Sequence, residues 1–310
     1  MIKPFLVIVG PTASGKSDLA FKLAHEFKGE IINADSRQVY IGMEIGTNSP
    51  DPHHFSKIPH HLFSFLKPDE PFNVGLYKPM AINKIYEVQQ KGKLPIIVGG
   101  TGQYIWSLLE GWNIPNVSPD PEYRRLLEDK SIKGLDYELY EELMKIDPGS
   151  RSSINPNNKR RIIRALEIFH STGVPASILK TKTPPKWDYF LMGLTMERNK
   201  LYCTSNKQIE KMFQQGWVAE VTTLLNKGYH FELSSMSSLG YKEIGDYLKG
   251  EQSFDQTIKR IQTNTHRFIR SQYGWFRLND NRIHWINNYQ NNISEVINLA
   301  TAKLSKNNFP

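Results

Sequence analysis

The sequence predicts an α/β fold, in which helices flank a parallel sheet and the chain is interrupted by an inserted all-helical domain. Short apolar runs alternate with helical patterns along the first hundred residues, which is typical of strand–helix–strand units. Proline-rich stretches at about residues 115 and 184 enclose a more polar, helical region. We therefore expect a catalytic core made of residues 1–114 and 185–310, and a helical insertion made of residues 115–184.

The strongest motif lies between the first expected strand, residues 5–9, and the helix after it. Residues 10–17 read GPTASGKS and match the phosphate-binding pattern G-x-x-x-x-G-K-[ST]. In such a loop backbone N–H groups face phosphate oxygens, Lys16 adds a positive charge, and the Ser17 hydroxyl can ligate Mg²⁺. The motif predicts a phosphate-loop NTPase-like core. The expected diphosphate-binding residues are Gly10, Pro11, Thr12, Ala13, Ser14, Gly15, Lys16 and Ser17.

Composition excludes several classes of protein. With 310 residues and 39% hydrophobic residues, the chain can bury a sizeable core and is not a disordered protein. It has no apolar run long enough for a membrane helix or a signal peptide. The lone cysteine, Cys203, fits a reducing cytoplasm. A net charge of +8 favours a polyanionic partner, although dispersed lysines would give the same total.

Two further turns follow expected strands of the core. Asp35 comes directly after the strand at residues 30–34, and Thr101 lies in the glycine-rich turn after the strand at residues 94–98. Because the carboxyl ends of parallel strands meet at one edge of a sheet, we expect both residues near the phosphate loop. Asp35 then fits either a carboxylate on the Mg²⁺ side or a general base. The glycine-rich turn fits a ligand contact and a structural turn equally well.

Residues 41–76 contain too many prolines and glycines for long regular elements, so we expect a lid or substrate loop there. Four histidines lie in this segment as two adjacent pairs. The adjacent spacing and the absence of a nearby cysteine favour hydrogen bonding or packing over a metal site. These histidines are His53, His54, His60 and His61.

A cationic helix is expected at residues 159–169 of the insertion. Its apolar stripe consists of Ile162, Ala165, Leu166 and Phe169. Arginines gather on another face, which suits a nucleic-acid backbone but also fits an ordinary solvated helix face. These arginines are Arg160, Arg161 and Arg164.

Helical spacing also predicts two later helices of the core. One covers residues 207–225, and the last long helix begins near Ser253. In this last helix we expect four core residues and a cationic face that is a second candidate for phosphate contact. The core residues are Ile258, Ile261, Phe268 and Trp275, and the cations are Lys259, Arg260, Arg267 and Arg270.

Taken together, seven segments in this order resemble the tRNA dimethylallyltransferase family over almost the whole chain. They read GPTASGKS, NADSRQVYIGMEIGT, PHHL, LPIIVGGTGQYI, INPNNKRRIIRALEIF, SLGYKEIGDYLKG and SQYGWFR. The resemblance implies Mg²⁺-dependent transfer of a dimethylallyl group from dimethylallyl diphosphate to tRNA, with release of diphosphate. The acceptor is N6 of the adenine 3′ to the anticodon, in the anticodon stem-loop of tRNAs that read codons beginning with U. We expect a monomeric cytoplasmic enzyme.

The resemblance also implies roles for individual residues. Asp35 is the base, Lys16 stabilises the departing diphosphate, and Thr101 belongs to the catalytic group. The target adenine would be flipped out of its loop to reach them. The residues implied to contact tRNA are Asp35, Ser36, Arg37, Gln38, Thr101, Arg124, Arg160, Arg161, Ile162, Ile163 and Arg164.

The chain departs from the family pattern at four positions. Thr204 and Gln208 stand where the family has arginines, of which the first is implied to stabilise the diphosphate. His266 replaces a third arginine, and Gly274 replaces a threonine. The candidates to replace the missing charge are Lys207 and Arg198.

Two other functions stay open at this point. A phosphate-loop kinase of a nucleotide or small metabolite would explain the loop but not the cationic insertion helix. A tRNA-binding paralogue with reduced turnover would explain Thr204 and Gln208.

Overall fold

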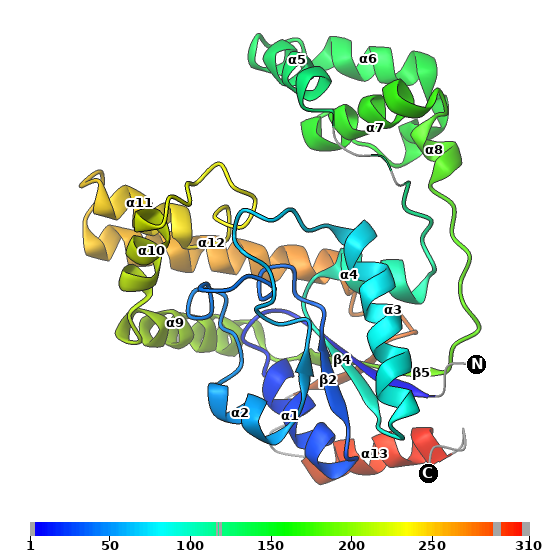
Figure 1. Ribbon diagram of the computed structural model, residues 1–310, viewed down its shortest axis with the longest axis vertical. Coiled ribbons are helices and arrows are strands. Elements are labelled where there is room, and N and C mark those ends of the chain that lie inside the picture. Colours follow the sequence, from blue (N-terminus) through cyan, green and yellow to red (C-terminus); the bar gives the residue numbers. More distant parts are fainter. Residues whose placement is uncertain (1–3, 116, 118–119, 288–292, 306–310) are drawn as a thin grey trace. The chain divides into compact units, whose positions relative to one another are not determined.

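The computed structural model describes residues 4–115, 117, 120–287 and 293–305 (Figure 1). Residues 1–3, 116, 118–119, 288–292 and 306–310 belong to the expected domains but lie outside the described residues. The chain divides into two compact units. The core unit consists of residues 1–105 and 186–310, and the insertion unit consists of residues 106–185.

The insertion unit thus begins at residue 106, whereas the prolines indicated residue 115. The segments that enter and leave the unit pair with each other, so residues before the first proline also belong to it. The Asn113 N–H donates to the Thr181 carbonyl at 2.8 Å, and the Thr183 N–H donates to the Gly111 carbonyl at 3.1 Å. Residues 111–113 are therefore bonded to residues 181–183 of the insertion unit.

A six-stranded, fully parallel sheet forms the centre of the core unit, as the alternating pattern predicts. Its order is β3-β2-β4-β1-β5-β6, so the strand before the phosphate loop is central. The strands are β1 (Phe5–Val9), β2 (Glu30–Asn33), β3 (His60–His61), β4 (Pro95–Val98), β5 (Tyr189–Thr195) and β6 (His284–Asn287). In register, Ile8 of β1 lies opposite Val98 of β4 and Met192 of β5.

Helices cover both faces of this sheet, because successive strand residues point to opposite faces and both sets are apolar. Leu6 and Ile8 pack with α1 (Lys16–Glu26) and α13 (Ile293–Ser305) on one face. Phe5, Val7 and Val9 alternate with them and are also fully buried. The helix α3 (Val74–Gln90) packs against β2 and β4 (Figure 1).

A second core of the core unit is helical and contains Val39, Tyr40 and Met43. Its helices are α9 (Arg198–Gln214), α10 (Trp217–Asn226), α11 (Tyr241–Leu248) and α12 (Phe254–Trp275). The expected single helix over residues 207–225 is wrong, since Gly216 with φ of 97° separates α9 from α10. A left-handed residue of this kind ends one helix and reorients the chain.

The buried stripe of α12 also differs from the expected one. Phe268 and Trp275 are 44% and 37% exposed, so the expectation that they lie in the core is wrong. The apolar pattern misled because the buried face of this helix combines two isoleucines with polar residues. The buried residues are Thr257, Ile261, Thr265, Ile269 and Gln272.

The segment at residues 41–76 contains only the short elements α2 (Pro52–Lys57) and β3 before α3 begins at Val74. Its histidines take part in local contacts. The His54 ring stacks on Phe21 with centroids 4.0 Å apart, and His61 Nε2 lies 2.7 Å from Glu30 Oε2. His60 Nδ1 lies 2.7 Å from the Ile58 carbonyl. Across the ranges described above, no group of three His, Cys, Asp or Glu residues could hold a metal ion.

The insertion unit is helical and has its own core, which includes Leu127, Leu139 and Ile162. Its elements are α5 (Pro121–Ile132), α6 (Asp136–Ile146), η1 (Pro148–Ser152), α7 (Lys159–Thr172) and α8 (Ala176–Leu179), while α4 (Gly102–Leu109) contains the boundary. In the described part of the chain, no helix is long and apolar enough to cross a membrane.

Candidate active site

The phosphate loop connects the carboxyl end of the central strand β1 to the start of α1 at Lys16. Gly15 has φ of 88°, a left-handed conformation that suits glycine and turns the chain into the helix. Ser14 is 2% exposed, and its hydroxyl has no hydrogen-bond partner among the residues described. A buried hydroxyl of this kind fits a ligand rich in oxygen atoms, because an unbonded polar group is otherwise costly.

Lys16 carries the positive charge of the loop. Its ammonium donates to the Pro11 carbonyl at 2.7 Å. Burial lowers the pKa of Lys16 to about 8, whereas the negative charge of Asp35 acts in the opposite direction. The carboxylate of Asp35 is therefore one of the charges that act on Lys16.

Asp35 follows β2 and is held by a local network of backbone hydrogen bonds. Asn33 receives the Asp35 N–H through Oδ1 at 2.8 Å and donates Nδ2 to the Asp35 carbonyl at 3.0 Å. Asp35 Oδ1 receives the Arg37 N–H at 2.9 Å. Within the described chain, Asp35 Oδ2 has no hydrogen-bond partner. One carboxylate oxygen thus fixes the side chain, and the other can accept a proton.

The turn after β4 lies directly against the turn after β2. The Ser36 N–H donates to Thr101 Oγ1 at 3.0 Å, and the Thr101 N–H donates to the Ala34 carbonyl at 3.2 Å. The Thr101 hydroxyl in turn donates to Ser36 Oγ at 3.3 Å. Asp35 and Thr101 are therefore held in one rigid corner at the carboxyl edge of the sheet.

The next two expected tRNA contacts have partners inside the core unit. The Arg37 guanidinium donates to the Ser234 carbonyl and to Ser237 Oγ, the latter at 3.3 Å. Gln38 Nε2 donates to the carbonyls of Thr47 and Asn48 at 3.1 and 2.9 Å. Both side chains thus position loops of the core unit.

At Thr204 and Gln208, where the family has arginines, the side-chain hydrogen bonds are with neutral groups. Thr204 donates its hydroxyl to the Lys200 carbonyl at 2.8 Å, and Gln208 Nε2 donates to Asn48 Oδ1 at 2.7 Å. His266 stacks on Tyr202 with centroids 4.0 Å apart. A cation of α12 lies beside this pair, since Arg270 Nη1 donates to the Tyr202 hydroxyl at 3.0 Å.

Three of the other positions named from the sequence lie at the surface. Lys207 and Arg198 are exposed on α9, and neither has a hydrogen bond or ion pair with a described residue. Gly274 is exposed on α12.

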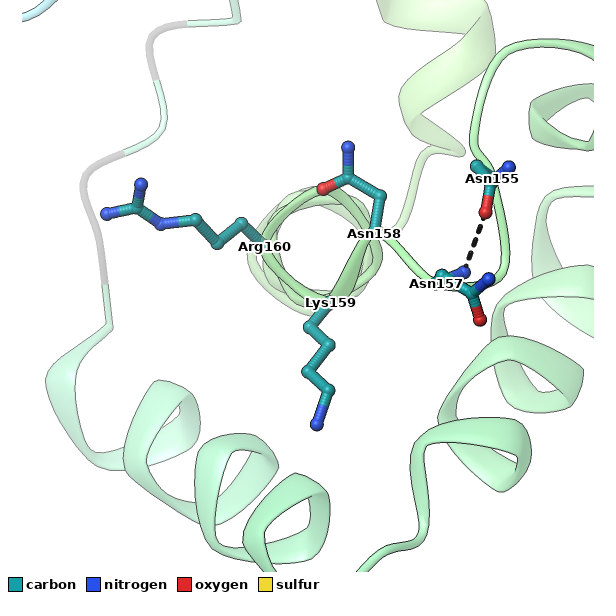
Figure 2. Close-up of a pocket in the computed structure, with 5 residues that line it drawn as sticks. All are labelled: Asn155, Asn157, Asn158, Lys159 and Arg160. Atoms are coloured by element: carbon teal, nitrogen blue, oxygen red, sulfur yellow. Dashed lines mark hydrogen bonds between the residues drawn. The ribbon is translucent and has the colours of Figure 1, made fainter. Parts of the chain in front are cut away.

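In the insertion unit, α7 begins beside a shallow pocket lined by Asn155, Asn157, Asn158, Lys159 and Arg160 (Figure 2). Asn158 caps the helix by receiving the Arg161 N–H at 3.3 Å, and Asn155 Oδ1 receives the Asn157 N–H at 2.9 Å. Figure 2 shows Arg160 and Lys159 pointing away from the helix in different directions.

The cations at the start of α7 are not equivalent. Lys159, which was not among the expected contacts, pairs with Asp136 at 2.6 Å, and Arg161 Nη1 donates to the Ser153 carbonyl at 3.3 Å. Arg160 is exposed, and no described residue bonds to its side chain. Of these three, Arg160 is therefore the most available for an external anion.

Arg124 and Arg164 converge on one buried carboxylate, that of Glu167. Glu167 is fully buried, and its Oε2 receives Arg124 Nη2 at 2.6 Å and Arg164 Nη1 at 3.4 Å. Arg164 also donates to the Val117 carbonyl at 2.8 Å. Buried charges need such partners, so these arginines stabilise the insertion unit whatever else they contact. The sequence did not single out Glu167, because it lies outside the apolar stripe of Ile162, Ala165, Leu166 and Phe169 and no local pattern marks it as buried.

Ile162 and Ile163, implied as tRNA contacts by the resemblance, are only 1% and 6% exposed. Their side chains pack in the core of the insertion unit, which gives both residues a structural role there.

Comparison with known proteins agrees with this geometry. The family model described as IPP transferase matches residues 38–279. A tRNA dimethylallyltransferase from Dehalococcoides mccartyi is 44% identical over 299 residues, which cover 96% of this chain and 92% of that protein. One from a Roseiflexus species is 44% identical over 274 residues, which cover 88% and 90%.

Solved structures give the same result. The tRNA isopentenylpyrophosphate transferase from Bacillus halodurans is 34% identical and aligns with a TM-score of 0.73, over 99% of this chain and 98% of that chain. A eukaryotic dimethylallyltransferase, described as acting on tRNA, aligns with a TM-score of 0.81 at 26% identity, over 98% of this chain and 80% of that chain. The chain therefore belongs to the IPP transferase family, whose curated relatives here are tRNA dimethylallyltransferases.

Proposed function

We propose that this protein transfers a dimethylallyl group from dimethylallyl diphosphate to tRNA and releases diphosphate. The acceptor is N6 of the adenine 3′ to the anticodon in tRNAs that read codons beginning with U. One observation carries the proposal: the turn after β2 with Asp35 and the turn after β4 with Thr101 are bonded together, and Asp35 acts electrostatically on Lys16 of the phosphate loop.

The phosphate loop holds the donor through its diphosphate. When the bond between the allylic carbon and the diphosphate oxygen breaks, negative charge develops on the departing group. The Lys16 ammonium and the N–H groups at the start of α1 lie where they can stabilise that charge. The buried hydroxyl of Ser14 offers a further donor.

Mg²⁺ would add positive charge at the diphosphate, and Ser17 is the residue we expect to hold it. The Ser17 hydroxyl is exposed in the first turn of α1. Because Mg²⁺ in such sites takes most of its ligands from water and phosphate oxygens, one protein hydroxyl in the loop is a sufficient fit.

Asp35 is the base of the reaction. The adenine amine becomes acidic as its nitrogen bonds to the allylic carbon, and the carboxylate accepts the released proton. Fixing Asp35 through Oδ1 leaves Oδ2 for this transfer, which favours the general-base role over a purely Mg²⁺-side role. Thr101 and Ser36 line the same corner as Asp35, and we expect them to orient the acceptor adenine.

The test is nucleoside analysis of unmodified tRNA incubated with the protein, Mg²⁺ and dimethylallyl diphosphate. Prenylated adenosine is expected with the native chain. Asp35→Asn keeps the shape of the side chain but removes the base, so transfer should fall by at least about a hundredfold while tRNA affinity changes less than about threefold. Normal turnover by this variant would contradict the assignment of Asp35.

The control experiments separate the other two functions. Phosphorylation from ATP without prenyl transfer would support a kinase, whereas tRNA binding without any transfer would support a binding paralogue. Asp255→Asn makes the same chemical change at an exposed position near the start of α12, so it is a matched control and should retain turnover.

A further inference from the structure

Gln272 connects the phosphate loop to the turn that carries Thr101. Its side chain is 2% exposed on the buried face of α12. Gln272 Oε1 receives the Thr12 N–H at 2.8 Å, and Gln272 Nε2 donates to the Gly100 carbonyl at 3.2 Å. One amide thus bonds to both segments, which are far apart in the sequence.

The backbone around Gln272 is tightly packed. A Cβ atom on Gly100 would lie 2.3 Å from Gln272 Nε2 and 3.6 Å from the Gly10 carbonyl oxygen. A side chain at position 100 would therefore push the amide out of place. The next residue of α12 is anchored separately, because the Tyr273 hydroxyl and Thr195 Oγ1 lie 2.8 Å apart at the end of β5.

These contacts relate the two halves of the candidate site. Thr12 lies in the loop that holds the donor diphosphate. Gly100 precedes Thr101, whose hydroxyl receives the Ser36 N–H in the corner that contains Asp35. Because an uncharged amide accepts through oxygen and donates through nitrogen, Gln272 satisfies both contacts at once without placing a charge beside the phosphate.

We propose that Gln272 is a positioning residue that holds the phosphate loop against the Thr101 turn and so aligns the donor with the acceptor adenine. The inference rests on the function proposed above. Gln272 acts through Thr12 and Gly100. Since a reacting pair displaced by about 1 Å can lose about a hundredfold in rate, a bond that fixes both sides is expected to affect turnover.

Gln272→Glu provides a test through pH. A protonated carboxyl group can receive the Thr12 N–H and donate to the Gly100 carbonyl, whereas a carboxylate cannot donate and repels that carbonyl oxygen. Burial raises the pKa of a carboxyl group, so the change falls within a usable pH range. We expect kcat within about threefold of the native value at pH 6 and about tenfold lower at pH 8.5, with the KM for tRNA unchanged.

Gln214→Glu makes the same chemical change at an exposed position of α9 and should follow the native pH profile. Unfolding temperatures at each pH show whether the variants stay folded. If Gln272→Glu does not fold at high pH, Gln272→Met removes both hydrogen bonds without a charge and should lower kcat about tenfold at every pH. A constant ratio of variant to native kcat across pH, or native kcat in Gln272→Met, would overturn the inference.

The binding of inorganic pyrophosphate with Mg²⁺ keeps this test separate from the proposed function. The ratio of the Gln272→Glu to the native dissociation constant should rise about tenfold between pH 6 and pH 8.5, whether or not the native protein prenylates tRNA. A constant ratio would overturn the positioning role. Absence of native prenyl transfer would instead refute the proposed function alone.

Discussion

Lys16 is the residue whose protonation most directly controls the candidate site. Its pKa is lowered to about 8 by burial, so it remains mainly protonated at pH 7 and loses its charge as pH rises through 8. Pyrophosphate favours the charged form. We therefore expect the affinity for pyrophosphate, measured by titration calorimetry, to be highest below pH 8 and to decrease by about tenfold by pH 9.5.

The ionisation of pyrophosphate itself complicates this measurement, and Lys16→Met corrects for it. The variant keeps an apolar stem of similar length but has no ammonium group. Its affinity should be lower throughout and should lack the decrease above pH 8. If native protein and variant change in parallel with pH, the charge of Lys16 is not what binds the anion.

Among individual residues of the site, the sequence predicted the positions of those that directly follow strands. Asp35 and Thr101 could be placed because they come directly after apolar runs, and the carboxyl ends of parallel strands share an edge. Gln272 could not be placed, since its partners are 172 and 260 residues away. The local sequence indicated only that Gln272, three residues after the buried Ile269, lies on the same face of α12.

Among the elements, α7 shows why a cluster of arginines in the sequence does not give equal roles. Arg124 and Arg164 neutralise the buried Glu167, while Arg160 is exposed without a bond to a described residue. Helical periodicity grouped Arg160, Arg161 and Arg164 on one face, but periodicity is silent on partners from other helices. Arg124, on α5, lies 43 residues from its partner.

Arg160→Ala and Arg124→Ala should therefore behave differently. Loss of Arg160 removes one phosphate contact and should reduce the slope of log affinity for tRNA against log salt by about one unit, with no change in unfolding temperature. Loss of Arg124 leaves Glu167 with one long ion pair and should lower the free energy of unfolding by about 2 kcal/mol.

Salt titrations of tRNA binding and thermal unfolding distinguish these effects. Arg125→Ala, at an exposed position next to Arg124 on α5, is the matched control and should leave both quantities near their native values. An unchanged salt slope for Arg160→Ala would mean that this end of α7 faces solvent in the complex. Unchanged stability for Arg124→Ala would show that Arg164 alone compensates Glu167.

For the molecule as a whole, the sequence predicted the sheet and the insertion but not the elements that lack a strong local signal. The edge strand β3 has only two residues, and β6 lacks the fully buried run that marks the equally short strands β2 and β4. The helix α10 was merged with α9, because apolar spacing continued across Gly216. Residues 111–113 join the insertion unit through backbone pairing with residues 181–183, which composition does not reveal.

The division into two units, each with its own core, gives a prediction for the entire chain. Pyrophosphate with Mg²⁺ binds the phosphate loop, which belongs to the core unit, and it should stabilise only the unit that contains the loop. At a hundredfold excess over the dissociation constant, the gain is about 2.7 kcal/mol.

Differential scanning calorimetry should then show two transitions, of which only the larger moves to higher temperature with pyrophosphate. Lys16→Met, which lacks the binding charge, serves as the control and should show no such movement. Two transitions are expected because the hydrophobic cores have no residue in common. The core around the sheet contains Leu6 and Ile8, and the core of the insertion unit contains Leu139 and Ile162. A single transition that moves as one would mean that the two units unfold cooperatively, and the insertion would then have to be treated as part of the catalytic fold.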